Sequence, residues 1–369
     1  MPRANGANYS EVASARVLHM ATRIRHILVA IGDILRAPRS ELRKAGALAR
    51  AARATVELFH AIDEPDPERS FLETATRQEV DEQRAAIVEK YQRRLERFAH
   101  DPSLRGVSAR CTASRDYPAH AAIIRRALAA HSDLVIATTR GRRFGARLLL
   151  RNTDWELIRH CPVPLLIVKS PRAYRRPAVL AAVDPFHAHA RPADLDARLL
   201  ETGGAMARLL HGSLQVFHAY WPLVTVQPVV AATAPLVMLS PEAEDAHTLQ
   251  VMRAIGELVD KAGVPRSRCH IRMGEVADQL SAFARRSRTA VVVMGAVSRS
   301  AIKRFFVGNA AGRTLDRLNC DVLVVKPRGF RSGVERAPAV AASSKRARAR
   351  LPRSRGATAA TRGVPPPFL

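Results

Sequence analysis

The chain has 369 residues, a formal net charge of +26 and 47% hydrophobic residues. This length allows two domains of ordinary size, each with its own buried core. No apolar run approaches the roughly 20 residues that a membrane-spanning helix needs. Residues 1–10 are polar and lack the apolar region of a signal peptide, so we expect a cytoplasmic protein.

The basic charge is unevenly distributed. Residues 331–369 hold nine Lys or Arg and one Glu among many Ala, Ser and Pro, which predicts a disordered basic C-terminal tail. Residues 1–24 form a short N-terminal extension, and the remaining charge follows no dense stripe. The tail has few aromatic residues for base stacking, so non-specific nucleic-acid binding through it is a competing function rather than the leading one.

The four cysteines are widely separated and show no paired spacing typical of a metal site. They are Cys111, Cys161, Cys269 and Cys320. We predict reduced, mostly buried thiols and no metal other than magnesium that accompanies a nucleotide.

An internal repeat is the most informative feature of the sequence. Short apolar segments of the first half recur in the second half, in the same order. The pairs are 25–31 with 178–184, 57–61 with 215–219, 133–137 with 290–294, and 164–169 with 321–326. Each segment has the length and composition of a buried strand.

Segments with helical spacing lie between these strands. They cover residues 71–98 and 118–130 in the first half, and 241–261 and 275–286 in the second. Apolar strands that alternate with helices predict a parallel sheet covered on both faces. We therefore expect an α/β protein of two tandem, doubly wound, five-stranded domains, at residues 25–170 and 176–328. The loops after the first and fourth strands of each domain should flank its crevice.

A loop in the second half has the features of a phosphate site. Gly295 and Ser298 follow the fourth strand, and Gly308-Asn309 open the next helix nine residues later. The free backbone amides of a helix start attract an anion, and glycine lets a ligand approach the backbone. Arg299 could add a charge-assisted contact to phosphate.

This loop resembles that of the universal stress proteins that bind ATP. Their pattern is Gly, two residues, Gly, nine residues, then Gly-Ser or Gly-Thr; here Ser298 and Asn309 replace the second Gly and the hydroxyl residue. The family's aspartate after the first strand, which contacts the nucleotide, is matched by Asp184. The segments 152–162 and 306–321 are similar to tandem members of the family, and the resemblance covers roughly residues 25–328.

The first half departs further from this pattern. Thr138, Gly141, Arg151 and Asn152 stand at the corresponding loop positions, and Gly32, next to Asp33, replaces the aspartate. We therefore expect a degenerate loop in the first domain and ligand binding in the second.

The resemblance implies an adenine nucleotide alpha hydrolase-like fold. It also implies a stress-survival role that includes DNA damage tolerance, and ATP or another phosphate-bearing anion as ligand. The two domains should pair as an internal pseudo-dimer, with a further homodimer open. No residue pattern indicates dedicated catalysis, although slow ATP hydrolysis near Asp184 stays open.

One enzyme-like pattern competes with this interpretation. Asp184-Pro185-Phe186-His187-Ala188-His189 resembles the Asp-Pro-x-His-x-Gly-His motif of nucleotidyltransferases. The second histidine comes one residue early and no second signature loop is present, so this function is the weaker alternative. His60 and His218 occupy matching strand-end positions, where we expect hydrogen-bonded side chains and no metal.

Overall fold

The structure, a computed structural model, describes residues 24–62, 77–138, 143–144, 147–148, 152–186, 194–220, 241–296 and 309–334. Residues 1–23 and 335–369, which hold almost all of the predicted N-terminal extension and basic tail, lie outside these ranges.

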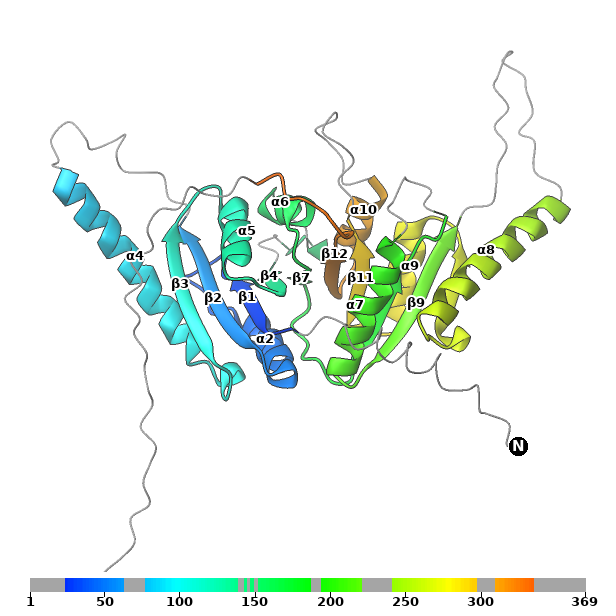
Figure 1. Ribbon diagram of the computed structural model, residues 1–369, viewed down its shortest axis with the longest axis horizontal. Coiled ribbons are helices and arrows are strands. Elements are labelled where there is room, and N and C mark those ends of the chain that lie inside the picture. Colours follow the sequence, from blue (N-terminus) through cyan, green and yellow to red (C-terminus); the bar gives the residue numbers. More distant parts are fainter. Residues whose placement is uncertain are drawn as a thin grey trace, which may run out of the picture. The chain divides into compact units, whose positions relative to one another are not determined.

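Five strands and four helices alternate in the described part of the first half, as predicted (Figure 1). A short hairpin of two further strands, which the sequence did not indicate, lies in the loop after the fourth strand. The elements are β1 His26–Ala30, α2 Arg39–Ala52, β2 Thr55–Ile62, α4 Arg77–Ala99, β3 Ala109–Arg115, α5 Ala119–Ala129, β4 Leu134–Thr138, β5 Arg143–Phe144, β6 Arg147–Leu148, α6 Asn152–His160 and β7 Leu165–Val168.

The second half repeats the alternation of five strands and four helices within its described residues. The elements are β8 Ala178–Ala182, α7 Leu195–Leu209, β9 Ser213–Tyr220, α8 Pro241–Lys261, β10 Cys269–Met273, α9 Val276–Arg286, β11 Val291–Gly295, α10 Asn309–Arg317 and β12 Asp321–Val325. Glu275 caps α9, because its carboxylate accepts a hydrogen bond from the backbone N–H of Asp278 at 3.0 Å.

All ten long strands join one sheet, in the order β10-β9-β8-β11-β12-β7-β4-β1-β2-β3. Neighbours within each half run parallel, and the fifth strands of the two halves, β7 and β12, pair antiparallel. In the first half, β2 and β3 follow one another on one side of β1, and β4 lies on its other side. In the second half, β9 and β10 lie on one side of β8, and β11 lies on the other. These positions are the switch points of doubly wound domains, where the first and fourth strands of each half are neighbours. Most of the loops predicted to meet there lie outside the described residues.

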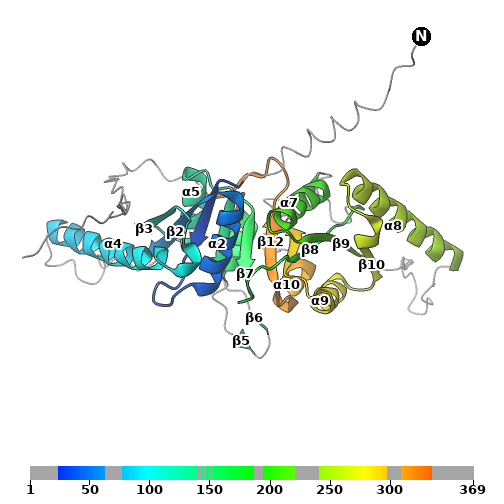
Figure 2. The ribbon, with the colours of Figure 1, turned by 90° about the horizontal axis from the view of Figure 1, so that it is seen from below.

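Strand alternation divides the core into two layers. Ile27 and Val29 of β1 face one layer, with α2, α4, α7 and α8, whereas Leu28 and Ala30 face the other, with α5, α6, α9 and α10. Viewed from below, α4 lies beside β3 at one end of the sheet and α8 beside β9 and β10 at the other (Figure 2). Helices on both faces explain why the strands are apolar throughout.

Four helices end on a basic residue in a left-handed conformation. Arg53, His131, His211 and Arg288 follow α2, α5, α7 and α9, with φ between 49° and 55°. Glycine or asparagine is usual at such positions, because other residues meet steric strain there. The cations of Arg53 and Arg288, near helix C-termini, also interact favourably with the helix dipole.

The seam between β7 and β12 carries a pair of reciprocal contacts. The ammonium of Lys169 donates a hydrogen bond to the carbonyl oxygen of Leu315 in α10, and that of Lys326 donates to the carbonyl oxygen of Arg159 in α6 at 2.9 Å. Each lysine follows the fifth strand of its own half and binds the last turns of a helix in the other half. Burial lowers the pKa of each lysine to about 8. The two halves thus form the predicted internal pair.

Candidate functional site

The carboxyl ends of β8 and β11 bring two predicted site residues to one edge of the sheet. Val293 of β11 pairs with Ala181 of β8. Two residues further along each strand, Gly295 falls opposite Val183, directly before Asp184. Sequence positions 111 residues apart therefore meet at the switch point of the second half.

The loop that starts with Asp184 is tied to the first turn of α7. The backbone N–H of Asp184 donates to both carboxylate oxygens of Asp196, each at 3.2 Å. Asp196 is only 2% exposed. The sequence reasoning missed this residue, although an Asp in the first turn of an apolar helix was the available signal. The contact fixes where the chain leaves β8.

Gly295 has a packing role in the structure. A Cβ added at this position would lie 2.6 Å from Cδ2 of Leu195, which is fully buried at the start of α7. No side chain fits without movement of Leu195. The glycine therefore lets α7 approach β11 closely, and this contact explains it without a ligand.

His218, near the end of β9, combines a hydrogen bond on one ring nitrogen with an unpartnered nitrogen on the other. Its Nδ1 lies 2.9 Å from the carbonyl oxygen of Val183, which confirms the predicted hydrogen-bonded strand-end histidine. The side chain is 4% exposed, and Nε2 is buried without a hydrogen-bond partner among the described residues. Since Nδ1 donates to the carbonyl, Nε2 of the neutral ring is an acceptor.

The rings of Phe186 and Tyr220 lie beside this imidazole, and the ring of His247 contacts both of them. We call the four residues the aromatic cluster: Phe186, His218, Tyr220 and His247. Ring centroids are 6.2 Å apart for Phe186 and His218, 6.4 Å for His218 and Tyr220, and 5.7 Å for Tyr220 and His247. Phe186 is 36% exposed. Residues from β9, α8 and the loop after β8 thus place aromatic faces beside a buried acceptor.

The corresponding edge of the first half is occupied by its own side chains. Nδ1 of His60 lies 2.7 Å from the carbonyl oxygen of Ile31, and its ring packs against Tyr91 of α4 at a centroid distance of 5.1 Å. Asp33 accepts the backbone N–H of Leu35 at 3.0 Å and pairs with Arg36 at 3.6 Å, so its carboxylate serves a local turn.

Thr138, the last residue of β4, takes the place that Gly295 has in the second half. Its hydroxyl is buried without a hydrogen-bond partner in the described part of the chain. The first domain therefore differs from the second at two of the predicted positions.

Most of the predicted phosphate loops lie outside the described residues. This holds for Ser298, Arg299 and Gly308 in the second half, for Gly141 and Arg151 in the first, and for His187 and His189 of the enzyme-like motif. Asn309 and Asn152 are the first residues of α10 and α6. The helix α10 thus starts where the anion-binding amides were predicted, and α6 starts at the corresponding position of the first half.

The described residues hold no group of three or more His, Cys, Asp or Glu side chains arranged to bind a metal ion. All four cysteines are free, and burial raises the pKa of the Cys161 and Cys320 thiols to about 12. Within the same residues, no helix has the length and apolar character required to span a bilayer.

Comparisons with known proteins agree with this architecture. The chain is 28% identical to universal stress protein E of Escherichia coli (strain K12) over 224 residues, which is 58% of this chain and 67% of that protein. It is 26% identical over 196 residues to the universal stress protein E homolog of Haemophilus influenzae, covering 53% of this chain and 62% of that protein.

Solved structures share the fold of both halves. A universal stress protein from Pseudomonas aeruginosa UCBPP-PA14 superposes with a TM-score of 0.60 at 22% identity, over 84% of this chain and 95% of that chain. One from Archaeoglobus fulgidus DSM 4304 gives a TM-score of 0.52 at 15% identity, over 81% of this chain and 98% of that chain. The sequence profile of the universal stress protein family matches residues 23–169 and again residues 179–326. With two matched segments that span most of its length, the chain belongs to the universal stress protein family.

Proposed function

We propose that this chain is a cytoplasmic stress-response protein whose second domain binds a nucleotide-type ligand and performs no dedicated catalysis. The observation that carries the proposal is the buried Nε2 of His218, an acceptor without a partner among the described residues. A buried polar atom left without a hydrogen bond costs free energy, and a ligand group that donates to this nitrogen would remove that cost.

The surroundings of His218 favour a ligand with a planar, hydrogen-bonding group. An exocyclic amine of a base or a sugar hydroxyl would donate to Nε2. Phe186, which is 36% exposed, is a candidate for stacking on a base, and base–aromatic stacking contributes about 1–3 kcal/mol. Asp184 starts the loop beside these groups, and its N–H is already bound by Asp196. Its carboxylate is thus a candidate contact to the ligand, as the resemblance implies.

The phosphate end of the ligand would lie toward the start of α10. The first backbone amides of a helix have no partner within the helix and can receive an anion, and Ser298, Arg299, Gly308 and Asn309 remain the proposed contacts around it. ATP is the first probe, with magnesium as the accompanying ion. A reducing, cytoplasmic location suits four free thiols.

The experiment compares matched positions in the two halves. In His218→Asn the amide nitrogen can keep the hydrogen bond to the carbonyl of Val183, while the group at Nε2 is lost. ATP affinity, measured by calorimetry on the full chain, should fall about tenfold, as expected for one lost hydrogen bond. His60→Asn in the first half should leave affinity unchanged. Equal effects of the two variants, or a wild-type chain that neither retains a ligand in native mass spectrometry nor takes up ATP, would reject the proposal.

A further inference from the structure

A basic pocket lies at the amino ends of β8 and β11, on the opposite edge of the sheet from the aromatic cluster. It encloses about 840 Å³ and is lined by the linker between the halves, residues 170–177, by the end of α9, and by the turn before β12. Ala178 and Ala290, at the starts of β8 and β11, form part of its wall.

Seven cationic side chains and no carboxylate line this pocket. The seven are Lys44, Arg172, Arg175, Arg176, Arg285, Arg288 and Arg317. Lys44 is paired with Asp321, and Arg317 with Asp278. The other five arginines have no ion-pair partner within the described ranges, and all five are exposed. The pocket therefore concentrates positive charge that the described part of the protein does not neutralise.

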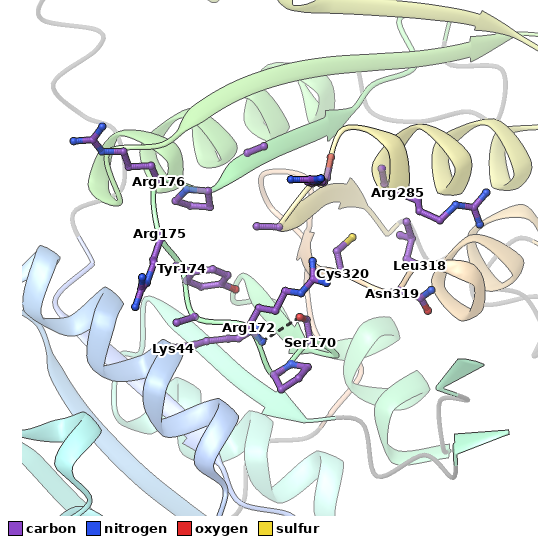
Figure 3. A pocket seen from close by; sticks show the side chains of 18 of the residues that line it. Lys44, Ser170, Arg172, Tyr174, Arg175, Arg176, Arg285, Leu318, Asn319 and Cys320 are labelled. Atoms are coloured by element: carbon purple, nitrogen blue, oxygen red, sulfur yellow. Dashed lines mark hydrogen bonds between the residues drawn. The ribbon is translucent and has the colours of Figure 1, made fainter. Parts of the chain in front are cut away.

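A favourable interaction with a helix dipole explains only some of the arginines in this pocket. Arg285 lies in the last turn of α9, and Arg288 follows its end, where cations complement the helix dipole. Arg172, Arg175 and Arg176 belong to no helix, yet they line the same pocket. Figure 3 shows Arg172 extending from the linker toward Cys320, while the guanidinium groups of Arg175 and Arg176 point away from Arg172.

The chemistry of the lining favours phosphate groups over bases. A guanidinium presents a planar fork of donors that matches two oxygens of one phosphate. The aromatic ring in the lining, Tyr174, is covered by the ammonium of Lys44 at 4.9 Å, and its hydroxyl donates to Asp321 at 2.6 Å. One face of the ring and its hydroxyl are therefore engaged by the protein itself, unlike the aromatic platforms of a site for single-stranded nucleic acid.

We propose that this pocket binds a compact oligophosphate anion, with Arg172 and Arg288 as principal contacts from its two sides. The proposal is independent of the nucleotide-type ligand of the second domain, because the two sites lie at opposite ends of β8. A bound anion would connect the linker to α9 and stabilise the linker against the second domain.

The test uses the full chain and inorganic tripolyphosphate as the probe. The double variant Arg172→Gln/Arg288→Gln should lose affinity by tenfold or more, since each guanidinium–phosphate contact is charge-assisted. The control, Arg105→Gln/Arg268→Gln, changes net charge equally at two exposed arginines outside the pocket, and should change affinity less than twofold. His218→Asn should leave tripolyphosphate binding intact, which separates this site from the proposed nucleotide site.

Three results would overturn the proposal. One is no tripolyphosphate binding at millimolar concentration. Another is an equal loss in the control, which would show a diffuse charge effect. The third is an oligonucleotide that binds tighter than tripolyphosphate through the same two arginines, which would make the pocket part of a nucleic-acid surface. In the His218→Asn variant, the affinities of ATP and tripolyphosphate for the basic pocket can be compared. We expect tripolyphosphate to bind at least as tightly as ATP, because the described lining of the pocket has no contact for a nucleoside.

Discussion

The ammonium of Lys44, on α2 of the first half, donates a hydrogen bond to the carboxylate of Asp321, at the start of β12 of the second half. The exposed fractions of the two side chains are 1% and 0%. The same carboxylate accepts the backbone N–H groups of Lys169 and Ser170, each at 2.9 Å. The hydroxyl of Tyr174 in the linker also donates to this carboxylate. Asp321 thus connects the first half, the linker and the second half through hydrogen bonds.

Removal of Lys44 should destabilise the protein strongly. Lys44→Met leaves a buried carboxylate without its cation, and loss of one partner of a buried pair typically costs about 3–5 kcal/mol. Urea unfolding measures the change in the free energy of unfolding. Lys261→Met, at an exposed lysine of α8, is the control and should have little effect.

The double variant Lys44→Met/Asp321→Asn should be more stable than Lys44→Met alone. The amide oxygen keeps the two backbone donors, and no charge remains buried. If the two single changes simply add, Lys44 and Asp321 are not energetically coupled, and the role assigned to their pair is wrong.

The seam lysines should make stability depend on pH between 8 and 10.5. Burial lowers the pKa of Lys169 and Lys326 from 10.5 to about 8. In this window the unfolded chain binds more protons than the folded one, so their contribution to stability rises with pH. The cost of charging them in the folded state is fully present below pH 8 and vanishes above 10.5.

The measurement compares wild type with Lys169→Met/Lys326→Met by urea unfolding at pH 8 and pH 10. The wild type should gain more stability over this interval than the variant, by about 2 kcal/mol per lysine. The comparison is differential because buried thiols act in the opposite direction: the raised pKa of Cys161 and Cys320 lowers stability as pH rises. Parallel pH profiles of the two proteins would contradict the assignment.

Gly295→Ala should lower the free energy of unfolding by about 1–3 kcal/mol, because the new methyl group overlaps Leu195. Gly333→Ala is the matched control: its added Cβ would meet only ordinary contacts, the closest 3.5 Å from His160. Combining Gly295→Ala with Leu195→Ala should cost less than the sum of the single changes. If the destabilisations of the two single variants simply add in the double variant, the methyl group introduced by Gly295→Ala does not act through a clash with Leu195.

Gln92 of α4 should protect the exposed edge of β3. Its side chain donates to the carbonyl oxygen of Cys111 at 3.1 Å and accepts the N–H of Ala113 at 3.0 Å, as a neighbouring strand would. Gln92→Leu should cost about 1–3 kcal/mol and promote self-association, seen by light scattering. Gln78→Leu, which removes only a surface contact to Glu82, should do neither.

Local patterns in the sequence predicted the strands and their helices, because each depends on short runs of apolar residues. The internal pairing was implied by the family resemblance. The local patterns also predicted that His60 and His218 would be hydrogen-bonded at strand ends, and the structure identifies the partners as backbone carbonyl groups. They could not predict Asp196 below Asp184, or Leu195 against Gly295, since such contacts depend on how closely a helix approaches the sheet. The pairing of Lys44 with Asp321 could not be predicted from local patterns, because the two residues are 277 positions apart in the sequence.

The antiparallel pair of β7 and β12 joins two halves that differ in sequence, and this affects the symmetry of the contacts between them. In a dimer of identical chains every seam contact occurs twice, so a change at one position alters both copies. Here Pro164 stands where the second half has Asp321, and the cluster of Lys44, Tyr174 and Asp321 exists once. A tether also keeps the halves at high effective concentration, so their association need not survive dilution. Within a single chain the two halves need not be identical, so each can carry contacts that the other lacks.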